Sequence, residues 1–102
     1  MPKASTLKKV ERLFRALGDT PRLKILLLLA EKERCVAELV EIFQENYSTI
    51  SQRLRLLRSE NLVEGRREGS HVYYSLSDHH VVELLKNALQ HADEENVDSE
   101  SP

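Results

Sequence analysis

The spacing of apolar residues changes along this chain, and the change limits the folds open to it. Before Asn61, apolar residues recur every three or four positions, as on the buried face of an α-helix. After Asn61 the period changes, and Val72, Tyr74 and Leu76 alternate with His71, Tyr73 and Ser75, which is typical of a β-strand. The helical spacing returns after Asp78. The sequence therefore predicts helices, then a β-hairpin, then a final helix.

Four helices are expected before the hairpin, each with recognisable end signals. The first is amphipathic, and Gly18 can close it as the C-cap. Thr20 is expected to cap the second, with Pro21 in its first turn; the following run is apolar almost all round, so we expect it at the centre of the core. A short third helix covers residues 36–43, and Ser48 is expected to cap the fourth.

The segment LVEGRREGSHVYYSL predicts a strand on each side of a turn that contains glycine. Arg66 and Arg67 are expected at its tip, with Gly65 and Gly69 letting the tip bend. Two short helices joined by a tight turn and followed by a hairpin predict a winged helix-turn-helix fold, mainly α with a small β-hairpin (α+β).

One domain is expected over residues 1–94, because a chain of this length has a single, modest core. Its last helix is predicted from near Asp78 to about Ala92, followed by a disordered acidic tail over residues 95–102. The N- and C-terminal helices are expected to mediate dimerisation, since a second copy would supply burial that a short chain lacks.

Charge and cysteine content narrow the class of protein. The net charge is −2, but residues 1–34 carry nine Lys or Arg against four acidic residues, whereas residues 83–102 carry six acids and one lysine. The net charge therefore does not exclude nucleic acid binding. The first residues do not have the pattern of a secretory signal, and no apolar run approaches the roughly 18 residues of a membrane helix. Cys35 is the one cysteine of the sequence, so no disulfide can form within the chain. We expect a cytoplasmic protein with no membrane partner.

A DNA recognition helix needs slender polar side chains in its first turns, where they reach base edges. The fourth helix supplies such side chains, and the hairpin arginines are placed to neutralise the DNA backbone. The predicted DNA-binding residues are Ser48, Thr49, Ser51, Gln52, Arg53, Arg55, Arg66 and Arg67. The alternative is that these arginines only solvate an exposed surface. Their joint placement on helix and wing favours the DNA interpretation.

Three of the four histidines fall in the last helix, and two of them share a face with an acid. At about 100° and 1.5 Å per residue, His80, His91 and Glu94 lie within roughly 60° of one another. His80 and His91 are nevertheless about 16 Å apart along the axis, whereas a zinc ligand lies about 2 Å from the ion. One helix therefore cannot close a metal site.

The spacing instead predicts two half-sites. His91 and Glu94 are one turn apart, and Asp78 can join His80 if Asp78 is the non-helical cap. Two copies of the helix packed antiparallel about a two-fold axis would bring the two kinds of half-site together and create two equivalent sites. Two imidazoles and two carboxylates suit Zn(II) and also Co(II), with Ni(II) and Cd(II) fitting less well. The alternative is that the histidines are only polar interface residues.

Three segments, FRALGDTPRLKILLLL, STISQRLRLLRSENLVEGRREGSHVYYSL and DHHVVELLKNALQHADE, resemble the ArsR/SmtB family of metal-sensing bacterial repressors. The resemblance implies a homodimer, not an enzyme, that binds operator DNA of inverted-repeat symmetry and releases it when zinc binds, so that metal efflux or sequestration genes are expressed. It implies no small organic substrate. The resemblance also implies the metal ligands, which are Asp78 and His80 of one subunit with His91 and Glu94 of the other. It also implies that His91 bonds a backbone carbonyl near Asn61, linking the metal site to the recognition helix.

Family members can carry a second, thiolate-rich site on the helix before the turn, and ERCVAEL keeps Cys35, with Glu38, at the similar position. A soft site would need more cysteines, so the sequence favours a small buried residue at Cys35 and disfavours arsenic sensing. Two rivals stay open. One is a winged-helix repressor that senses redox state through Cys35 or responds to no ligand. The other, a small metallo-hydrolase using His80, His91 and Glu94, is weaker because no phosphate loop or paired nucleophile and base is apparent.

Overall fold

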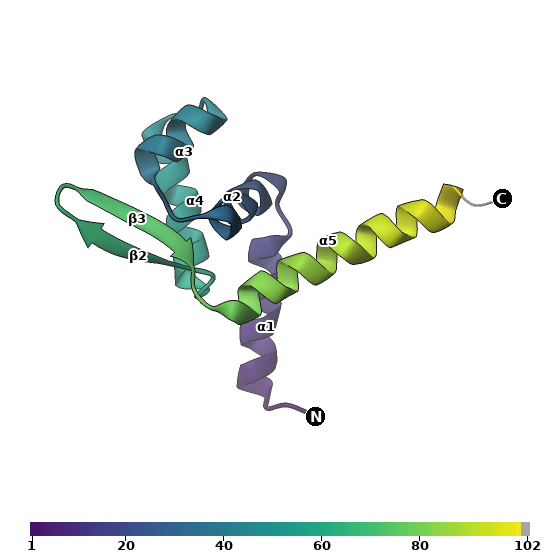
Figure 1. Cartoon of the computed structure of the whole chain (residues 1–102). Helices are drawn as coiled ribbons and strands as arrows, with labels where there is room; N and C mark the ends of the chain where they lie inside the picture. Colours follow the sequence, from purple (N-terminus) through teal and green to yellow (C-terminus); the bar gives the residue numbers. More distant parts are fainter. Residues whose placement is uncertain (101–102) are drawn as a thin grey trace.

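The computed structural model describes the backbone of residues 1–100 and the side chains of residues 1–93. The elements, in chain order, are α1 (Ala4–Leu17), α2 (Thr20–Glu31), β1 (Arg34–Cys35), α3 (Val36–Phe43), α4 (Tyr47–Ser59), β2 (Val63–Glu68), β3 (His71–Leu76) and α5 (His79–Glu100). α3 and α4 form the helix-turn-helix, and the β2–β3 hairpin projects from the body as a wing (Figure 1). The predicted winged helix-turn-helix is confirmed.

The sheet contains one strand that the sequence did not predict. β1 pairs with β3 through Arg34 with Tyr74 and Cys35 with Tyr73, which gives three antiparallel strands in the order β1-β3-β2. Two residues are too few to show alternation, so this strand leaves no periodic signal. Because β1 continues directly into α3, the helix-turn-helix is attached to one edge of β3 while the wing strand β2 occupies the other.

α2 lies at the centre of the core, as its apolar sequence predicts. Ile25 and Leu26 have no exposed surface, and Leu29 is 4% exposed. Burying each such side chain contributes about 1.5–3 kcal/mol. The other buried members of this cluster come from the surrounding elements: Ala16, Val36, Leu39, Ile50, Leu54, Leu57, Leu62, Val63, Val81 and Leu85.

Two helices begin slightly earlier than their predicted caps. Asp19, not Thr20, caps α2: its Oδ2 accepts the backbone N–H of the residue three positions on, at 3.1 Å. Asn46, not Ser48, caps α4 through its Oδ1, at 2.8 Å. Both caps have extended backbones, whereas Thr20 and Ser48 already lie inside the helices. The short carboxylate or amide thus takes the role that the neighbouring hydroxyl was predicted to have.

Asp78 caps α5 as predicted, because its Oδ1 accepts the backbone N–H of Val81 at 3.1 Å. The predicted end near Ala92 is wrong, since the helix continues to Glu100. No glycine or proline interrupts this part of the sequence, so nothing in it ends a helix sharply. The predicted boundary between residues 94 and 95 therefore does not coincide with the end of the helix. That residues 95–102 form a separate tail stays a prediction.

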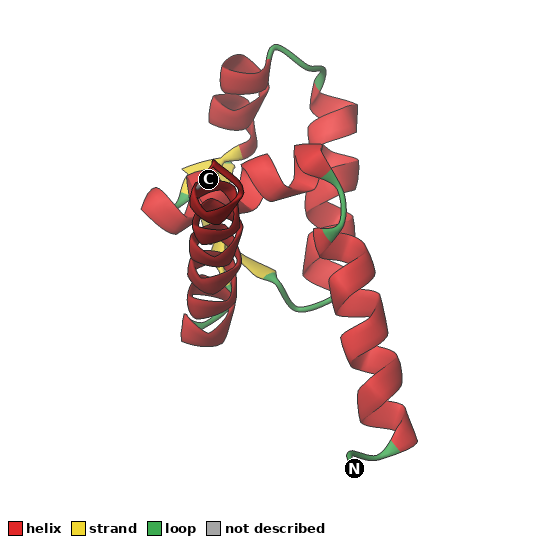
Figure 2. Ribbon diagram, turned by 90° about the vertical axis from the view of Figure 1, so that its right-hand side faces the viewer, coloured by secondary structure: helices red, strands yellow, loops and turns green. Residues whose placement is uncertain are grey.

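α1 and α5 both extend beyond the body of the domain (Figures 1 and 2). The outer surface of α1 carries Leu7, Val10 and Phe14, whose exposed fractions are 46%, 40% and 56%. On α5, Val81 and Leu85 in the first turns are buried in the core, whereas Leu89, further along, is 50% exposed. Each of the two helices therefore has apolar side chains that its own chain leaves uncovered.

We expect Asn46→Ala to lower the free energy of unfolding by about 1 kcal/mol, because the backbone N–H of Thr49 loses its acceptor. Ser48→Ala should change it by less than about 0.5 kcal/mol, since Ser48 is exposed and lies within the helix. Urea denaturation followed by circular dichroism measures both. A larger loss for Ser48→Ala than for Asn46→Ala would contradict this assignment of the cap.

Candidate nucleic-acid interface and metal half-site

The polar face of α4 is the candidate surface for reading DNA bases. Its apolar side chains Ile50, Leu54 and Leu57 are buried, so the polar residues between them are turned away from the core. Of the predicted DNA-binding residues on α4, three are exposed and three are partly exposed: Ser48, Gln52 and Arg55, then Thr49, Ser51 and Arg53. Polar side chains on the first turns of a projecting helix suit the major groove.

A cleft of about 390 Å³ lies between the start of α4 and the wing. Tyr47 and Ser51 line it from α4, and Arg67, Ser70 and His71 line it from the wing. The sequence did not single out Tyr47, although its side chain is 63% exposed. An aromatic residue directly before the expected cap, Ser48, was the signal for it. Such a ring can make apolar contact with a thymine methyl group.

The structure corrects the placement of Arg66 and Arg67. Both lie within β2, and the turn at the tip of the wing is formed by Gly69 and Ser70. Successive side chains of a strand point to opposite faces of a sheet, so the two arginines do not share one surface. Arg67 lines the cleft beside α4, whereas Arg66 lies on the opposite face of the wing.

Gly65 has a packing role rather than the predicted role in the tip. A Cβ at this position would lie 3.1 Å from Val72 Cγ1 and 3.2 Å from Tyr74 Cε1, so a side chain would displace residues of the neighbouring strand. Gly69 does lie in the turn, with φ of +63°, a conformation that favours glycine. The prediction is thus confirmed for Gly69 and wrong for Gly65.

The predicted DNA-binding arginines differ in their availability. Arg53 Nη1 lies 3.3 Å from Glu45 Oε1, and its side chain is 23% exposed. Arg55 and Arg67 are exposed and form no ion pair with any residue whose side chain is described. Of the predicted DNA-binding arginines, Arg55 and Arg67 are therefore the ones whose charge no acid among the described side chains compensates.

Arg66 is held by two acids and an aromatic ring. Its Nε and Nη2 donate to the two carboxylate oxygens of Glu33, its Nη1 donates to Glu68, and the guanidinium carbon lies 5.2 Å from the centre of the Tyr73 ring. The bond from Arg66 holds the pKa of Glu33 below its ordinary value, and the two acids raise the pKa of Arg66. The charge of Arg66 is compensated within the chain.

Asp78 and His80, the two residues of the half-site predicted at the start of α5, lie close together. His80 Nδ1 lies 3.6 Å from Asp78 Oδ1, and the side chains are 96% and 54% exposed. Two ligands about 2 Å from one ion at the tetrahedral angle are about 3.3 Å apart, so the pair needs little adjustment to share an ion. The same oxygen, Asp78 Oδ1, accepts the cap bond, but each carboxylate oxygen has two lone pairs, so the cap does not use up the carboxylate. His79 is separate and lies 3.3 Å from Glu83.

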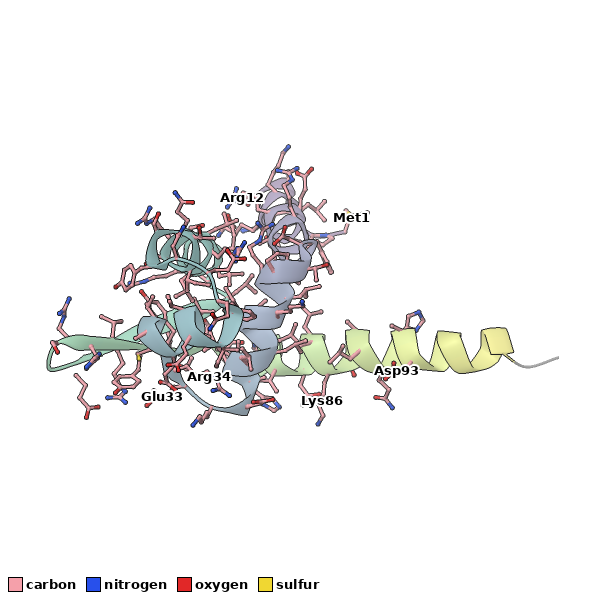
Figure 3. All side chains as sticks on the ribbon, turned by 90° about the horizontal axis from the view of Figure 1, so that it is seen from above. Met1, Arg12, Glu33, Arg34, Lys86 and Asp93 are labelled. Atoms are coloured by element: carbon pink, nitrogen blue, oxygen red, sulfur yellow. The ribbon has the colours of Figure 1, made fainter. Side chains whose placement is uncertain are left out.

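The second half-site is described only in part. His91 is exposed, and Glu94 lies outside the residues whose side chains the structure describes. Among the described residues, no three His, Cys, Asp or Glu side chains come together to hold a metal ion. Within that same part of the chain, no hydrogen bond joins His91 to Asn61. α5 carries Asp93 away from the body and continues beyond it (Figure 3).

Cys35 and Glu38 are engaged in starting α3. The backbone N–H of Cys35 donates to Glu38 Oε1 at 3.1 Å, and the Cys35 side chain accepts the backbone N–H of Glu38. The bond from the Cys35 backbone holds the pKa of Glu38 below its ordinary value. The thiol is buried, as predicted for a small core residue. This reciprocal capping favours a structural role for both residues.

Comparison with known proteins identifies similar regulators. Residues 19–65 match the family model described as "Bacterial regulatory protein, arsR family". The chain is 38% identical over 96 residues to a transcriptional repressor SmtB homolog from Synechocystis sp., covering 91% of this chain and 73% of that protein. It is 41% identical over 83 residues to a cadmium resistance transcriptional regulatory protein CadC homolog from Staphylococcus aureus, covering 80% and 69% of the two chains.

A solved structure shares the fold at a similar level of identity. It is the homodimeric winged helix-turn-helix DNA-binding domain from Mycobacterium bovis, with a TM-score of 0.87 and 40% identity, covering 90% of this chain and 85% of that one.

In the part of this chain that the structure describes, no helix combines the length and the apolar character that a membrane crossing needs.

We expect Glu38→Ala to lower the free energy of unfolding by about 1 kcal/mol at pH 7, because the backbone N–H of Cys35 loses its acceptor. A carboxyl whose folded pKa is lowered stabilises when ionised, so the contribution is present above about pH 4.5 and is lost as the pH falls through the folded pKa. Urea denaturation at pH 7 and pH 3 measures the difference from the unaltered chain. Glu41→Ala, on the exposed side of α3, is the control. An unchanged difference at pH 3 would contradict this role for Glu38.

Proposed function

This chain belongs to the ArsR family of bacterial regulatory proteins, and we propose that it is a homodimeric repressor that releases operator DNA when it binds a metal ion, with Zn(II) the best fit. The observation that carries the proposal is the pairing of Asp78 with His80 at the start of α5, where both side chains are open to a partner. Neither residue is needed for the core, because both are exposed. Their placement supports a ligand-binding role.

DNA binding is proposed for the polar face of α4 and the adjoining face of the wing. Ser48, Thr49, Ser51 and Gln52 would reach base edges from the first turns of α4. Arg55 and Arg67 would neutralise phosphates, because their charges are uncompensated within the described part of the chain. Arg53 would have to leave Glu45 to contact DNA. Two such surfaces in a two-fold dimer would read an inverted repeat.

A second copy of the chain is proposed to cover α1 and the outer part of α5. The exposed apolar side chains of α1, among them Phe14, would be removed from water by this packing. On α5, Val81 and Leu85 are buried in the core of their own chain, so the later part of the helix, including Leu89, is the part available to the partner. The homodimeric neighbour from Mycobacterium bovis supports this state for a chain of the same fold.

The metal site is proposed to form between subunits, with Asp78 and His80 from one and His91 and Glu94 from the other. Two carboxylates and two imidazoles match the ligands that Zn(II) and Co(II) accept. When bound, the ion would join the two helices through four protein ligands. Because each subunit contributes only half of the set, the site can close only in those dimers that bring the two halves together. The geometry of the dimer and the affinity for the ion are therefore linked.

The link to DNA is proposed to run through α5 and its neighbours. The repressor would bind DNA in the dimer geometry that it adopts without the ion, and closing the two metal sites would favour another spacing of the α4 helices. A bond from His91 to a backbone carbonyl near Asn61 would tie the metal site to the end of α4. Because coupling is reciprocal, DNA must weaken metal binding by the same factor.

One equivalent of Zn(II) per subunit should weaken DNA binding at least about tenfold. The probe is a fluorescent duplex that the protein itself selects from a random pool, and anisotropy reports the affinity. His91→Asn should bind this duplex normally but lose the response to zinc, because one half-site is broken. His79→Asn, on the same helix, should keep both properties, since His79 faces Glu83. Full release of the duplex by zinc in His91→Asn would contradict the proposed metal site. Loss of binding only after oxidation of Cys35 would instead select the redox alternative.

Two substitutions at Asp78 should separate its roles. Asp78→Asn keeps a side-chain oxygen for the cap of α5, so the free energy of unfolding should change by less than about 0.5 kcal/mol, while zinc affinity falls because the carboxylate is gone. Asp78→Ala should lose both the cap and the metal ligand, and its free energy of unfolding should fall by about 1 kcal/mol. Zinc affinity measured by competition with a chelating dye tests the first part, and urea denaturation tests the second. Unaltered zinc affinity in both variants would exclude Asp78 as a ligand.

A further inference from the structure

We propose that Glu33 and Arg66 form a clamp that fixes the angle of the wing relative to the helix-turn-helix, so that Arg66 positions the wing while Arg67 contacts DNA. The proposal rests on the proposed DNA-binding function and names residues that control it. Glu33 is not among the residues that the sequence predicts for DNA binding. Its contribution would be to hold the surface that binds.

The clamp crosses the whole width of the sheet. Arg66 lies in β2 and pairs with Tyr73 of the central strand β3, and Glu33 directly precedes β1 on the far edge. The guanidinium of Arg66 passes over the Tyr73 ring, 5.2 Å from its centre, and reaches both carboxylate oxygens of Glu33. Glu68 holds the remaining side of the guanidinium. A two-point bond to Glu33 fixes orientation as well as distance, which a single contact cannot do.

The anchored end of the clamp belongs to the helix-turn-helix. Glu33 is followed by the two residues of β1, and Cys35 then caps α3 through its reciprocal bonds with Glu38. Glu33 is thus three residues from the first turn of α3. The free end belongs to the wing, whose tip at Gly69 lies beyond Arg66. A restraint between these two ends limits how the wing can swing relative to α4.

Arg66 is poorly placed to contact the same DNA as Arg67. The two side chains leave opposite faces of β2, and it is Arg67 that lines the cleft beside α4. The charge of Arg66 is also compensated by Glu33 and Glu68, which accept its hydrogen bonds and raise its pKa. A single exposed ion pair contributes little to the stability of a fold. A two-point bond within a network of charges is the exception, because it holds both groups in one geometry. These contacts favour a positioning role.

The Glu33→Gln variant distinguishes a positioning role of the clamp from a simple effect of the Glu33 charge on DNA binding. Removing a negative charge from a DNA-binding protein should by itself strengthen binding, whereas loosening the wing should weaken it. We expect Glu33→Gln and Arg66→Gln each to weaken binding of the selected duplex by about twofold to tenfold, the range that loss of a modest contact gives. Glu64→Gln is the matched control, since Glu64 is an exposed acid of β2 without an ion pair to any described side chain. It should leave binding unchanged or slightly stronger.

The salt dependence of binding distinguishes the two arginines. Arg67→Gln should reduce the steepness of log affinity against log salt by about 1.8 per dimer, that is, about 0.9 for each of two lost phosphate contacts. Arg66→Gln should weaken binding while leaving the slope within about 0.5 of the unaltered protein, because no phosphate contact is lost. A fall of about 1.8 for Arg66→Gln would show a phosphate contact and overturn the clamp. Tighter binding by Glu33→Gln, or unchanged binding by both clamp variants, would overturn it as well.

A measurement without DNA keeps this proposal separate from the proposed function. NMR relaxation of the backbone amides of Gly69 and Ser70 should show larger fast motion in Glu33→Gln and Arg66→Gln than in the unaltered protein or in Glu64→Gln. Wing amides as rigid in the clamp variants as in the control would overturn the clamp, whatever the DNA result. Failure of the unaltered protein to select or bind any duplex would count against the DNA-binding function alone.

Discussion

Strand β3 forms hydrogen bonds along both of its edges, and the functional parts of this protein are arranged around it. On one edge, β1 leads directly into α3 and the helix-turn-helix; on the other, β2 completes the wing. Asp78, shortly after β3 ends, caps α5 and begins the candidate metal half-site. The candidate DNA surface and the candidate metal half-site are thus both connected to the same strand.

α5 divides its apolar side chains between its own chain and the outside. Val81 and Leu85 are buried in the core, which anchors the Asp78–His80 end firmly to the domain. Leu89 is half exposed on the part of the helix that projects away from the body. A helix anchored at one end and uncovered at the other would suit the proposed inter-subunit site, because the anchored half-site would follow its own domain while the other would project toward the partner subunit.

Several local features of the fold were predictable because they depend on neighbours in the sequence. The periods of the helices and hairpin, the C-cap at Gly18 and the cap at Asp78 each follow from residues within one or two turns. The caps of α2 and α4 were misplaced by a residue or two, since a hydroxyl and an acid or amide stood side by side and only the backbone conformation chose between them. The tip of the wing was misplaced because the sequence offers two glycines, Gly65 and Gly69. The pairing of β2 with β3 decided that Gly69 lies in the turn.

The sequence by itself determined the order of elements, the polar outer face of α4 and the distance between the two halves of the candidate metal site, because local periodicity and covalent spacing set all three. The tertiary structure decided which arginines keep an uncompensated charge. Arg66 meets Glu33 across the sheet, although 33 residues separate them in the chain. Arg67, its immediate neighbour, faces the cleft instead. Such contacts depend on strand register and on the side of the sheet that each residue occupies, and no local pattern specifies a partner so distant along the chain.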